Sequence, residues 1–194
     1  MGTIKTTNIE PIANNGTVTL GSSGDTFTVP SGVTVNMSNA TQTGVGGANT
    51  PAFEAYLSST QSISDGTTTK VNIDTENFDT NSNFASNRFT PTVAGKYFIY
   101  GSTVGYAGAV SDLVSSQAMI YKNGSYHAGG ETNYNTNLAQ RSYNTVSTIV
   151  DMNGSSDYVE LYGRILSVSG SGQLFESNTQ WKRATHFGAY RIIT

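Results

Sequence analysis

The stretch that decides the fold runs over residues 70–105, KVNIDTENFDTNSNFASNRFTPTVAGKYFIYGSTVG. Its last part, residues 96–104, is rich in aromatic and β-branched side chains, which is typical of the interior of a β-sheet. Side chains alternate between the two faces of a strand, so Phe98 and Tyr100 share one face while Tyr97 lies on the other. Because both faces are apolar, we expect cover on both sides, from a second sheet and from another subunit.

The chain around this stretch consists of short alternating segments separated by turn residues, with no helical periodicity. Asn123-Gly124 is the strongest hairpin signal, because both residues tolerate positive φ. The Asn153-Gly154 turn should be a long one, since two serines follow it. Further strands are expected over residues 52–57, 70–74, 112–121, 146–152, 157–166 and 185–193, and polar loops over 58–66 and 167–172. Residues 125–143 should form loops or short strands, and the whole pattern favours an antiparallel sandwich or jelly roll.

Motifs along residues 51–194 resemble, in order and spacing, the complement C1q-like domain of the tumour necrosis factor-like jelly rolls. They are PAFEAY at 51–56, Phe78-Asp79, Asn83-Phe84, RFTP at 88–91, Ala94-Gly95, Tyr97, Ile99, IYKNGS at 120–125, Asp157, Val159, Leu161 and HFGAYRI at 186–192. Three places depart from the family pattern: Ile99 replaces a usual Phe, Ala189 replaces a usual Gly, and Ser155 and Ser156 follow Gly154 where the family usually has Asp. The resemblance implies an all-β, antiparallel jelly-roll β-sandwich that assembles as a homotrimer.

In a trimer of this kind, the first, central and closing strands supply the subunit interface. The side chains that we predict there are Tyr56, Phe98, Tyr100, His186 and Tyr190. A slip of one residue in a strand would exchange its two faces, so this assignment depends on the register.

Residues 1–50 contain no Trp or Tyr and little charge, and we expect a separate β-rich stalk or attachment segment before a head of residues 51–194. Short alternating runs at residues 17–20, 26–29 and 33–37 are separated by turn residues. Strands this short bury too little alone, so we expect them to associate with copies from neighbouring chains. The alternative is a flexible leader with one hairpin. The glycine-rich residues 41–50 should act as a linker.

The N-terminal segment carries a second resemblance. TVTLGSSGDTFTVPSGVTVN, residues 17–36, resembles a segment of virion structural proteins of marine bacteriophages, and residues 3–11 are similar to the same group. This implies a location in the virion and attachment to other virion proteins through residues 1–50. The N-terminus lacks the apolar core of a signal peptide, and release by lysis would account for an extracellular particle.

Composition argues against several classes of function. The net charge is −3 and the isoelectric point is about 5.2, so no basic face is expected for nucleic acid. The absence of cysteine excludes disulfides and thiolate metal sites. No apolar run is long enough to span a bilayer, so we expect no membrane insertion.

No catalytic constellation stands out, and we expect a protein that is not an enzyme. The chain has two histidines, His127 and His186, and no G-x-S-x-G motif. Asp74, Glu76 and Asp79 form the densest group of carboxylates, with structural Ca²⁺ as the candidate occupant, although they lack EF-hand spacing.

Aromatic residues among Asn, Gly and Ser suit polar recognition, because aromatic rings can pack on sugar faces while amides bond hydroxyl groups. The candidates for contact with host surface carbohydrate are Tyr106, Tyr126, Tyr134 and Trp181. Taken singly, each could equally cap the sandwich or line a subunit contact. We therefore expect a non-enzymatic bacteriophage virion protein, a fibre or decoration, with a trimeric head. The alternatives are a bacterial surface or secreted adhesin head, a glycan depolymerase-like enzyme, and a decoration without a receptor.

Overall fold

The computed structural model describes residues 17–35, 49–176 and 183–192. The chain divides into two units, residues 1–45 and 46–194. The described part of the second unit, the head, is all-β and contains no helix. Its strands are β1 (Ala52–Tyr56), β2 (Gln61–Ser64), β3 (Thr69–Lys70), β4 (Thr75–Asp79), β5 (Phe84–Ala85), β6 (Arg88–Phe89), β7 (Gly95–Tyr106), β8 (Leu113–Lys122), β9 (Ser125–Asn133), β10 (Arg141–Met152), β11 (Val159–Ser167), β12 (Ser171–Leu174) and β13 (His186–Arg191).

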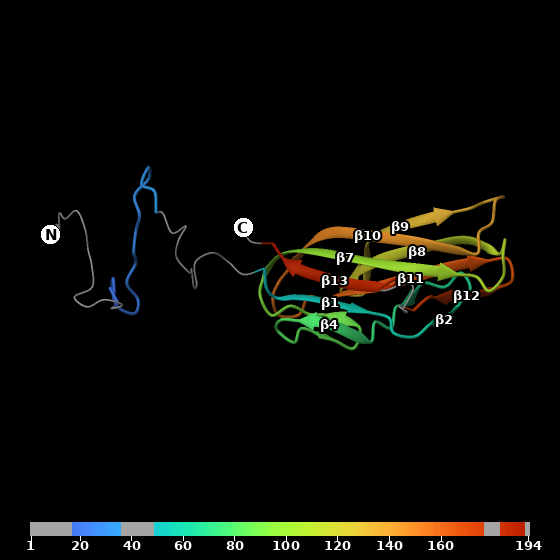
Figure 1. Ribbon diagram of the computed structural model, residues 1–194, viewed down its shortest axis with the longest axis horizontal. Coiled ribbons are helices and arrows are strands. Elements are labelled where there is room, and N and C mark those ends of the chain that lie inside the picture. Colours follow the sequence, from blue (N-terminus) through green and yellow to red (C-terminus); the bar gives the residue numbers. More distant parts are fainter. Residues whose placement is uncertain (1–16, 36–48, 177–182, 193–194) are drawn as a thin grey trace. The chain divides into compact units, whose positions relative to one another are not determined.

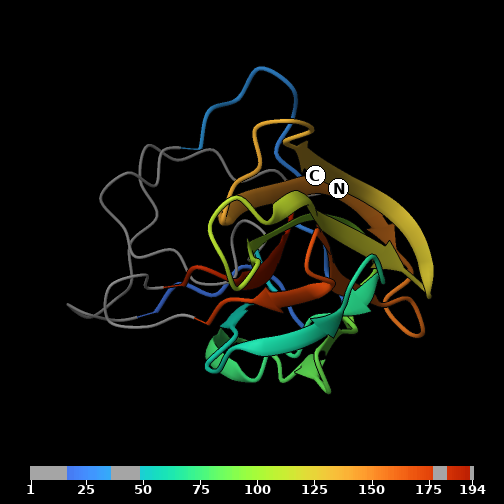
Figure 2. The ribbon, with the colours of Figure 1, turned by 90° about the vertical axis from the view of Figure 1, so that its right-hand side faces the viewer.

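The strands of the head form two antiparallel sheets (Figure 1). The seven-stranded sheet has the order β2-β12-β7-β13-β1-β4, and β10 pairs along the full length of β7. The six-stranded sheet has the order β5-β6-β11-β8-β9, and β3 joins it beside β11. Strands from the two ends of the head are neighbours, since β13 lies between β1 and β7. Figure 2 views the head along its strands.

The core lies between the sheets and is centred on aromatic rings. Phe53 of β1 stacks on Phe84 and Phe89, with ring centroids 4.6 Å away in each case. Phe187 of β13 meets Phe53 edge-on at 5.2 Å, and all four rings are buried. These side chains belong to the segments that carry the family resemblance, so those segments mark the centre of the sandwich.

Most expected strands and turns are confirmed. β1, β7, β8, β10, β11 and β13 occupy the predicted segments, with shifts of up to five residues at their ends. Asn123 and Gly124 have φ values of 51° and 77°, as the hairpin signal predicts. The turn after β10 is long, because the Asn153 side-chain oxygen accepts hydrogen bonds from three backbone amides, those of residues 155, 156 and 157.

Some expectations for the head are wrong. β2, β9 and β12 occupy segments expected as loops or short strands, because these short or polar segments show no clear hydrophobic alternation in the sequence. The strand expected at residues 70–74 is paired only at its start. Val71 donates to the carbonyl of Leu161 in one sheet and Asp74 to that of Tyr56 in the other, so this segment crosses between the layers.

Residues 17–35 of the first unit contain turns but no strand. The predicted turns are present, with backbone hydrogen bonds from Asp25 to Ser22 and from Val33 to Pro30. The predicted short strands do not form in the single chain, because each run has no partner surface on which to pair. Their apolar side chains are exposed, with Leu20 at 64 % and Phe27 at 71 %. Residues 36 and 37 of the third run lie outside the described residues.

Candidate functional site

The outer face of the seven-stranded sheet carries all five side chains that we predicted at a subunit interface. Tyr56 of β1 lies opposite His186 of β13, and Tyr190 of β13 lies opposite Phe98 of β7. Tyr100 lies two residues along β7 from Phe98, on the same face. We call this set, Tyr56, Phe98, Tyr100, His186 and Tyr190, the aromatic face. The structure brings these five residues together, whereas their role in assembly remains a prediction.

The rings of the aromatic face contact one another. The centroid of Phe98 lies 6.1 Å from that of Tyr100 and 5.5 Å from that of Tyr190. Tyr100 lies 5.9 Å from the ring of His186. Ile149 of β10 lies opposite Phe98 and extends the apolar surface, with 54 % of its area exposed. The result is a continuous apolar surface over three neighbouring strands.

Tyr100 is fixed in place by polar neighbours and by a glycine. Its hydroxyl donates a hydrogen bond to Glu54 Oε2 at 3.0 Å, and Arg183 pairs with the other oxygen of Glu54 at 2.8 Å. Burial raises the pKa of Tyr100, and the bond to Glu54 raises it further. The ring crosses Gly188 of β13, where a β-carbon would lie 2.9 Å from Cε1 of the ring and closer still to its outer atoms. Only a glycine lets the ring lie in this position.

One member of the aromatic face, His186, forms a Ser–His pair with Ser102 of β7 that we did not predict. His186 Nδ1 is 2.8 Å from the Ser102 hydroxyl and 2.7 Å from the carbonyl of Arg183. Because a carbonyl only accepts, this nitrogen carries the proton. Ser102 is buried and donates to the carbonyl of Ala184 at 2.7 Å. The nitrogen that faces Ser102 therefore has no free lone pair with which to act as a base, and the pair fixes the start of β13.

The three candidate calcium ligands do not gather at one point. Asp74 accepts hydrogen bonds from the backbone and hydroxyl of Ser58, both at 2.8 Å. Asp79 accepts from the backbone amides of Asn81 and Phe84 and so closes the loop after β4. Glu76 lies on β4 opposite Ala55. Within residues 17–35, 49–176 and 183–192, no three His, Asp or Glu side chains form a group that could hold a metal ion.

Three of the four candidate sugar-contacting residues lie in the described part of the chain, and each has different surroundings. Tyr106, at the end of β7, packs edge-on against Phe175 at 5.1 Å, and the guanidinium of Arg141 lies over both rings. Tyr134 packs against the core. Trp181 lies outside the described residues. Tyr106 and Tyr134 thus serve packing, whereas Tyr126 borders a pocket.

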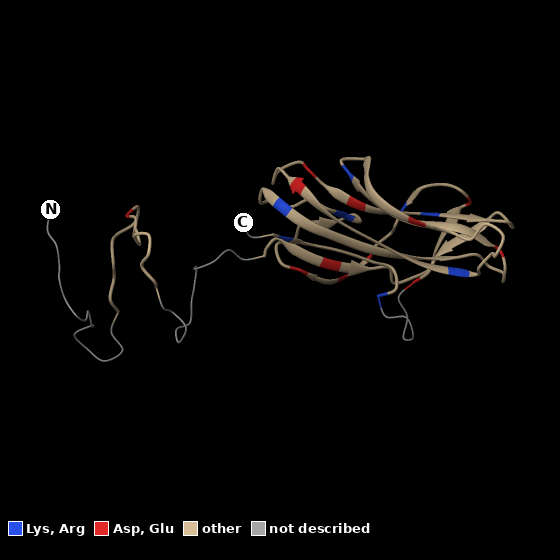
Figure 3. Ribbon diagram, turned by 90° about the horizontal axis from the view of Figure 1, so that it is seen from above, with Lys and Arg blue, Asp and Glu red and all other residues tan. Residues whose placement is uncertain are grey.

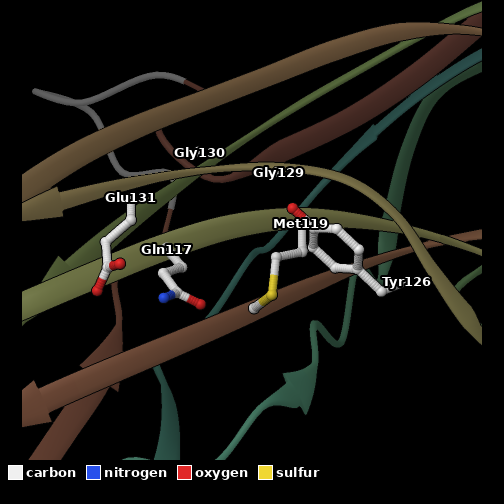
Figure 4. Close-up of a pocket in the computed structure, with 6 residues that line it drawn as sticks. All are labelled: Gln117, Met119, Tyr126, Gly129, Gly130 and Glu131. Atoms are coloured by element: carbon white, nitrogen blue, oxygen red, sulfur yellow. The ribbon is translucent and has the colours of Figure 1, made fainter.

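That pocket lies between β8 and β9 on the outer face of the six-stranded sheet and has a volume of about 160 Å³. We call it the β8–β9 pocket. Figure 4 shows its side chains projecting from one side of the two strands. Its lining residues are Gln117, Met119, Tyr126, Gly129, Gly130 and Glu131. Sequence reasoning found Tyr126 but missed the others, because a polar strand with two glycines shows no motif.

Lys and Arg residues are scattered along the strands and loops of the head, and the described part of the ribbon in Figure 3 shows no cluster of them. The most buried charge is Glu160, whose side chain is 3 % exposed and pairs with Lys70 at 2.7 Å and Arg88 at 2.9 Å. Burial alone would raise the pKa of Glu160, but the bonds from the two cations hold it below its usual value. In the described ranges there is no helix of the length and apolarity that a membrane span requires.

Comparison with known proteins identifies the fold. No protein-family model and no curated protein matches this sequence. Two structures of murine APRIL are similar: at pH 8.0 the TM-score is 0.51 with 8 % identity, and at pH 5.0 it is 0.50 with 9 %. Each match covers 73 % of this chain and 98 % or 99 % of the other. The globular domain of zebrafish complement 1qA has a TM-score of 0.48 with 11 % identity, over 73 % of this chain and 97 % of that one.

The fold is a C1q/TNF-like jelly roll. The expected fold class is therefore confirmed. Identities this low show the fold alone, so function has to come from the surfaces of this chain. The jelly roll presents two outer faces of different character, an apolar face on the seven-stranded sheet and a pocket on the six-stranded sheet.

Proposed function

We propose that this protein is a non-enzymatic structural protein of a bacteriophage virion, a fibre or decoration, with a homotrimeric head. Residues 1–50 attach the protein to other virion proteins, and the outward surface of the head binds host surface glycans. The observation that carries the proposal is the aromatic face, whose five side chains are all at least partly exposed among the described residues. The virion context is supported by the resemblance of residues 3–11 and 17–36 to phage virion proteins.

The aromatic face favours contact with further copies of the chain. Tyr190 is 40 % exposed and Ile149 is 54 % exposed, and both adjoin the ring of Phe98. Soluble monomers rarely leave a contiguous apolar surface of this kind in water. An ion pair lies on each flank of the aromatic face: Lys96 pairs with Asp151 at 2.7 Å, and Arg183 pairs with Glu54 at 2.8 Å. An apolar centre with a polar rim is the usual composition of a subunit interface.

The first unit supports attachment. Among residues 17–35, the apolar side chains of Val18, Leu20, Phe27 and Val33 are all exposed. Because they are not buried, they add no hydrophobic stabilisation to the single chain. Pairing with identical segments or with another virion protein would bury them. Assembly also helps the proposed binding role, since three weak glycan sites on one rigid head act together through effective concentration.

The test is the mass of the full-length protein by light scattering on size-exclusion fractions. We expect three times the 20.5 kDa mass of one chain. Ile149→Lys places a charge in the apolar face and should reduce the mass towards that of the monomer. Val110→Lys is the matched control, because Val110 is 75 % exposed outside the aromatic face. A monomeric wild-type protein would overturn the proposed trimer. If the Ile149→Lys variant is still a trimer, the subunit interface lies on another surface of the head.

The virion context has its own test. Mass spectrometry of purified phage particles should detect this chain in a fixed ratio to the other structural proteins. Detection on a bacterial envelope in place of a particle would favour the adhesin alternative. Deleting the head from the phage should reduce adsorption to the host. Unchanged adsorption would favour the alternative function, a decoration that binds no receptor.

A further inference from the structure

The β8–β9 pocket has a simple origin in the sequence. Gln117 and Met119 project from β8, and they lie opposite Glu131 and Gly129 of β9. Gly129 has no side chain, so a hollow is left on β9 between Tyr126 and Glu131. A β-carbon at Gly129 would lie 2.9 Å from Met119 Cγ and 3.1 Å from the Tyr126 hydroxyl, so the glycine also lets these side chains close in.

The lining groups combine an apolar wall with free hydrogen-bonding groups. The ring of Tyr126, 60 % exposed, supplies most of the apolar contact, and Met119, 5 % exposed, adds the small part of its side chain that reaches the pocket. Figure 4 shows the two side chains adjacent on one side of the pocket. The Gln117 amide and the Glu131 carboxylate lie on the other side. Among the described residues, Glu131 takes part in no ion pair. Its oxygens are therefore available as acceptors, while the amide both donates and accepts.

Further tyrosines lead away from the pocket across the sheet. The ring of Tyr121 lies 6.0 Å from Tyr126, which it meets edge-on, and 4.1 Å from Tyr162 of the next strand. Tyr126 is 60 % exposed, so the row begins at the rim of the pocket. A second ring of a bound chain would find an aromatic surface there.

We propose that the β8–β9 pocket binds one uncharged pyranose ring of a glycan. Tyr126 contacts the apolar face of the ring, with the small exposed part of Met119 beside it, and Gln117 and Glu131 bond its neighbouring hydroxyl groups. A volume of about 160 Å³ is below that of pockets for drug-sized ligands, so it suits a single ring. The Glu131 carboxylate disfavours acidic sugars. This inference rests on the proposed glycan-binding role of the head and gives that role a site and a ligand class.

The position of the pocket agrees with the proposed assembly. The pocket lies on the six-stranded sheet, whereas the aromatic face lies on the seven-stranded sheet, on the opposite side of the sandwich core. Assembly through the aromatic face would leave the pocket of every subunit open to solvent. Three such sites would give the avidity on which a weak monosaccharide site depends.

The experiment is saturation-transfer NMR on the full-length protein with defined methyl glycosides. The neutral probes are methyl β-D-glucopyranoside, methyl β-D-galactopyranoside and methyl α-D-mannopyranoside, and methyl β-D-glucuronide is the acidic counterpart. We expect at least one neutral probe to bind and the glucuronide to bind more weakly. Tyr126→Ala and Glu131→Ala should each weaken the neutral probe by about tenfold or more. His127→Ala is the matched control, since it is exposed on the same strand but outside the pocket.

Each outcome decides between the inference and the function on which it rests. If both pocket variants bind the neutral probe as well as wild type, with unchanged melting temperatures, the pocket is wrong while glycan binding by the head stands. A preference for the glucuronide overturns the ligand class. If wild type binds none of the neutral probes, the inference fails, and the trimer and its place in the virion are still judged by the light-scattering and particle experiments.

Discussion

Replacing Gly188 with alanine tests how the aromatic face is built. The new β-carbon would overlap the ring of Tyr100, so the ring has to swing away from β13 and release its 3.0 Å bond to Glu54. A hydrogen bond to a charged group contributes about 1.5–3 kcal/mol, and crowding adds about 1–3 kcal/mol. Because Tyr100 is only partly buried, some of that loss is recovered from water. We expect a net cost of about 2 kcal/mol in the free energy of unfolding.

The assay is thermal unfolding of the full-length protein at one fixed concentration, because the melting temperature of an oligomer depends on concentration. A loss of about 2 kcal/mol corresponds to a decrease of roughly 4–8 °C for a chain of this size. Gly108→Ala is the control, since a β-carbon at Gly108 meets nothing within 4 Å. Adding Tyr100→Ala removes the overlap, so in that background Gly188→Ala should cost almost nothing. Equal costs in both backgrounds, or a Gly188→Ala variant as stable as the control, would refute the reasoning.

Two further substitutions test the ion pairs and turns of the head. Glu160→Gln leaves two cations without their shared partner and should cost about 1–3 kcal/mol at pH 7, against at most about 1 kcal/mol for the exposed pair removed by Asp151→Asn. The pKa of Glu160 is lowered in the folded state, so its contribution to stability is present above about pH 4.5 and is lost on further acidification. The free energies of unfolding of variant and wild type, measured in urea, should therefore converge in acid. A difference that stays constant with pH would contradict the assignment. Gly154→Ala should cost more than 2 kcal/mol or prevent folding, because its φ is 70° and a β-carbon would overlap the backbone at Ala94; a soluble variant with wild-type melting temperature would contradict this.

The fold could be predicted from the sequence where a strand has at least one buried face. β7 shows this most clearly, because Tyr97 and Ile99 are buried in the core while Phe98 and Tyr100 form the aromatic face. Its aromatic residues and flanking turn signals placed it within one or two residues of its observed ends. In β9, by contrast, every residue is at least partly exposed, so the sequence shows no alternation of buried and exposed positions from which to predict a strand.

The candidate sites were predictable to different degrees for the same reason. The aromatic face follows from strand alternation plus the order of strands that the family resemblance implied. The β8–β9 pocket depends on the missing side chain of Gly129, and this role can be recognised only once the strand register places Met119 opposite it. The carboxylates at Asp74, Glu76 and Asp79 were close in sequence but not in space, because the chain between them passes from a crossing segment into β4. The closeness of these carboxylates in the sequence therefore predicted a metal site, whereas the arrangement of the strands keeps them apart.

The edge strand β10 gives the strongest physical reason to expect assembly. In the described residues it pairs with β7 alone, over twelve residue pairs, so its other edge presents backbone groups without ladder partners. Soluble proteins usually protect such edges with charges, bulges or covering segments, yet the outward side chains of β10 include Tyr143 and Ile149, both at least half exposed. A long and largely uncharged edge beside the aromatic face would promote irregular aggregation unless a defined partner covers it. A closed ring of identical subunits would give the β10 edge of every subunit the same neighbour, whereas an open arrangement leaves one such edge free at its end.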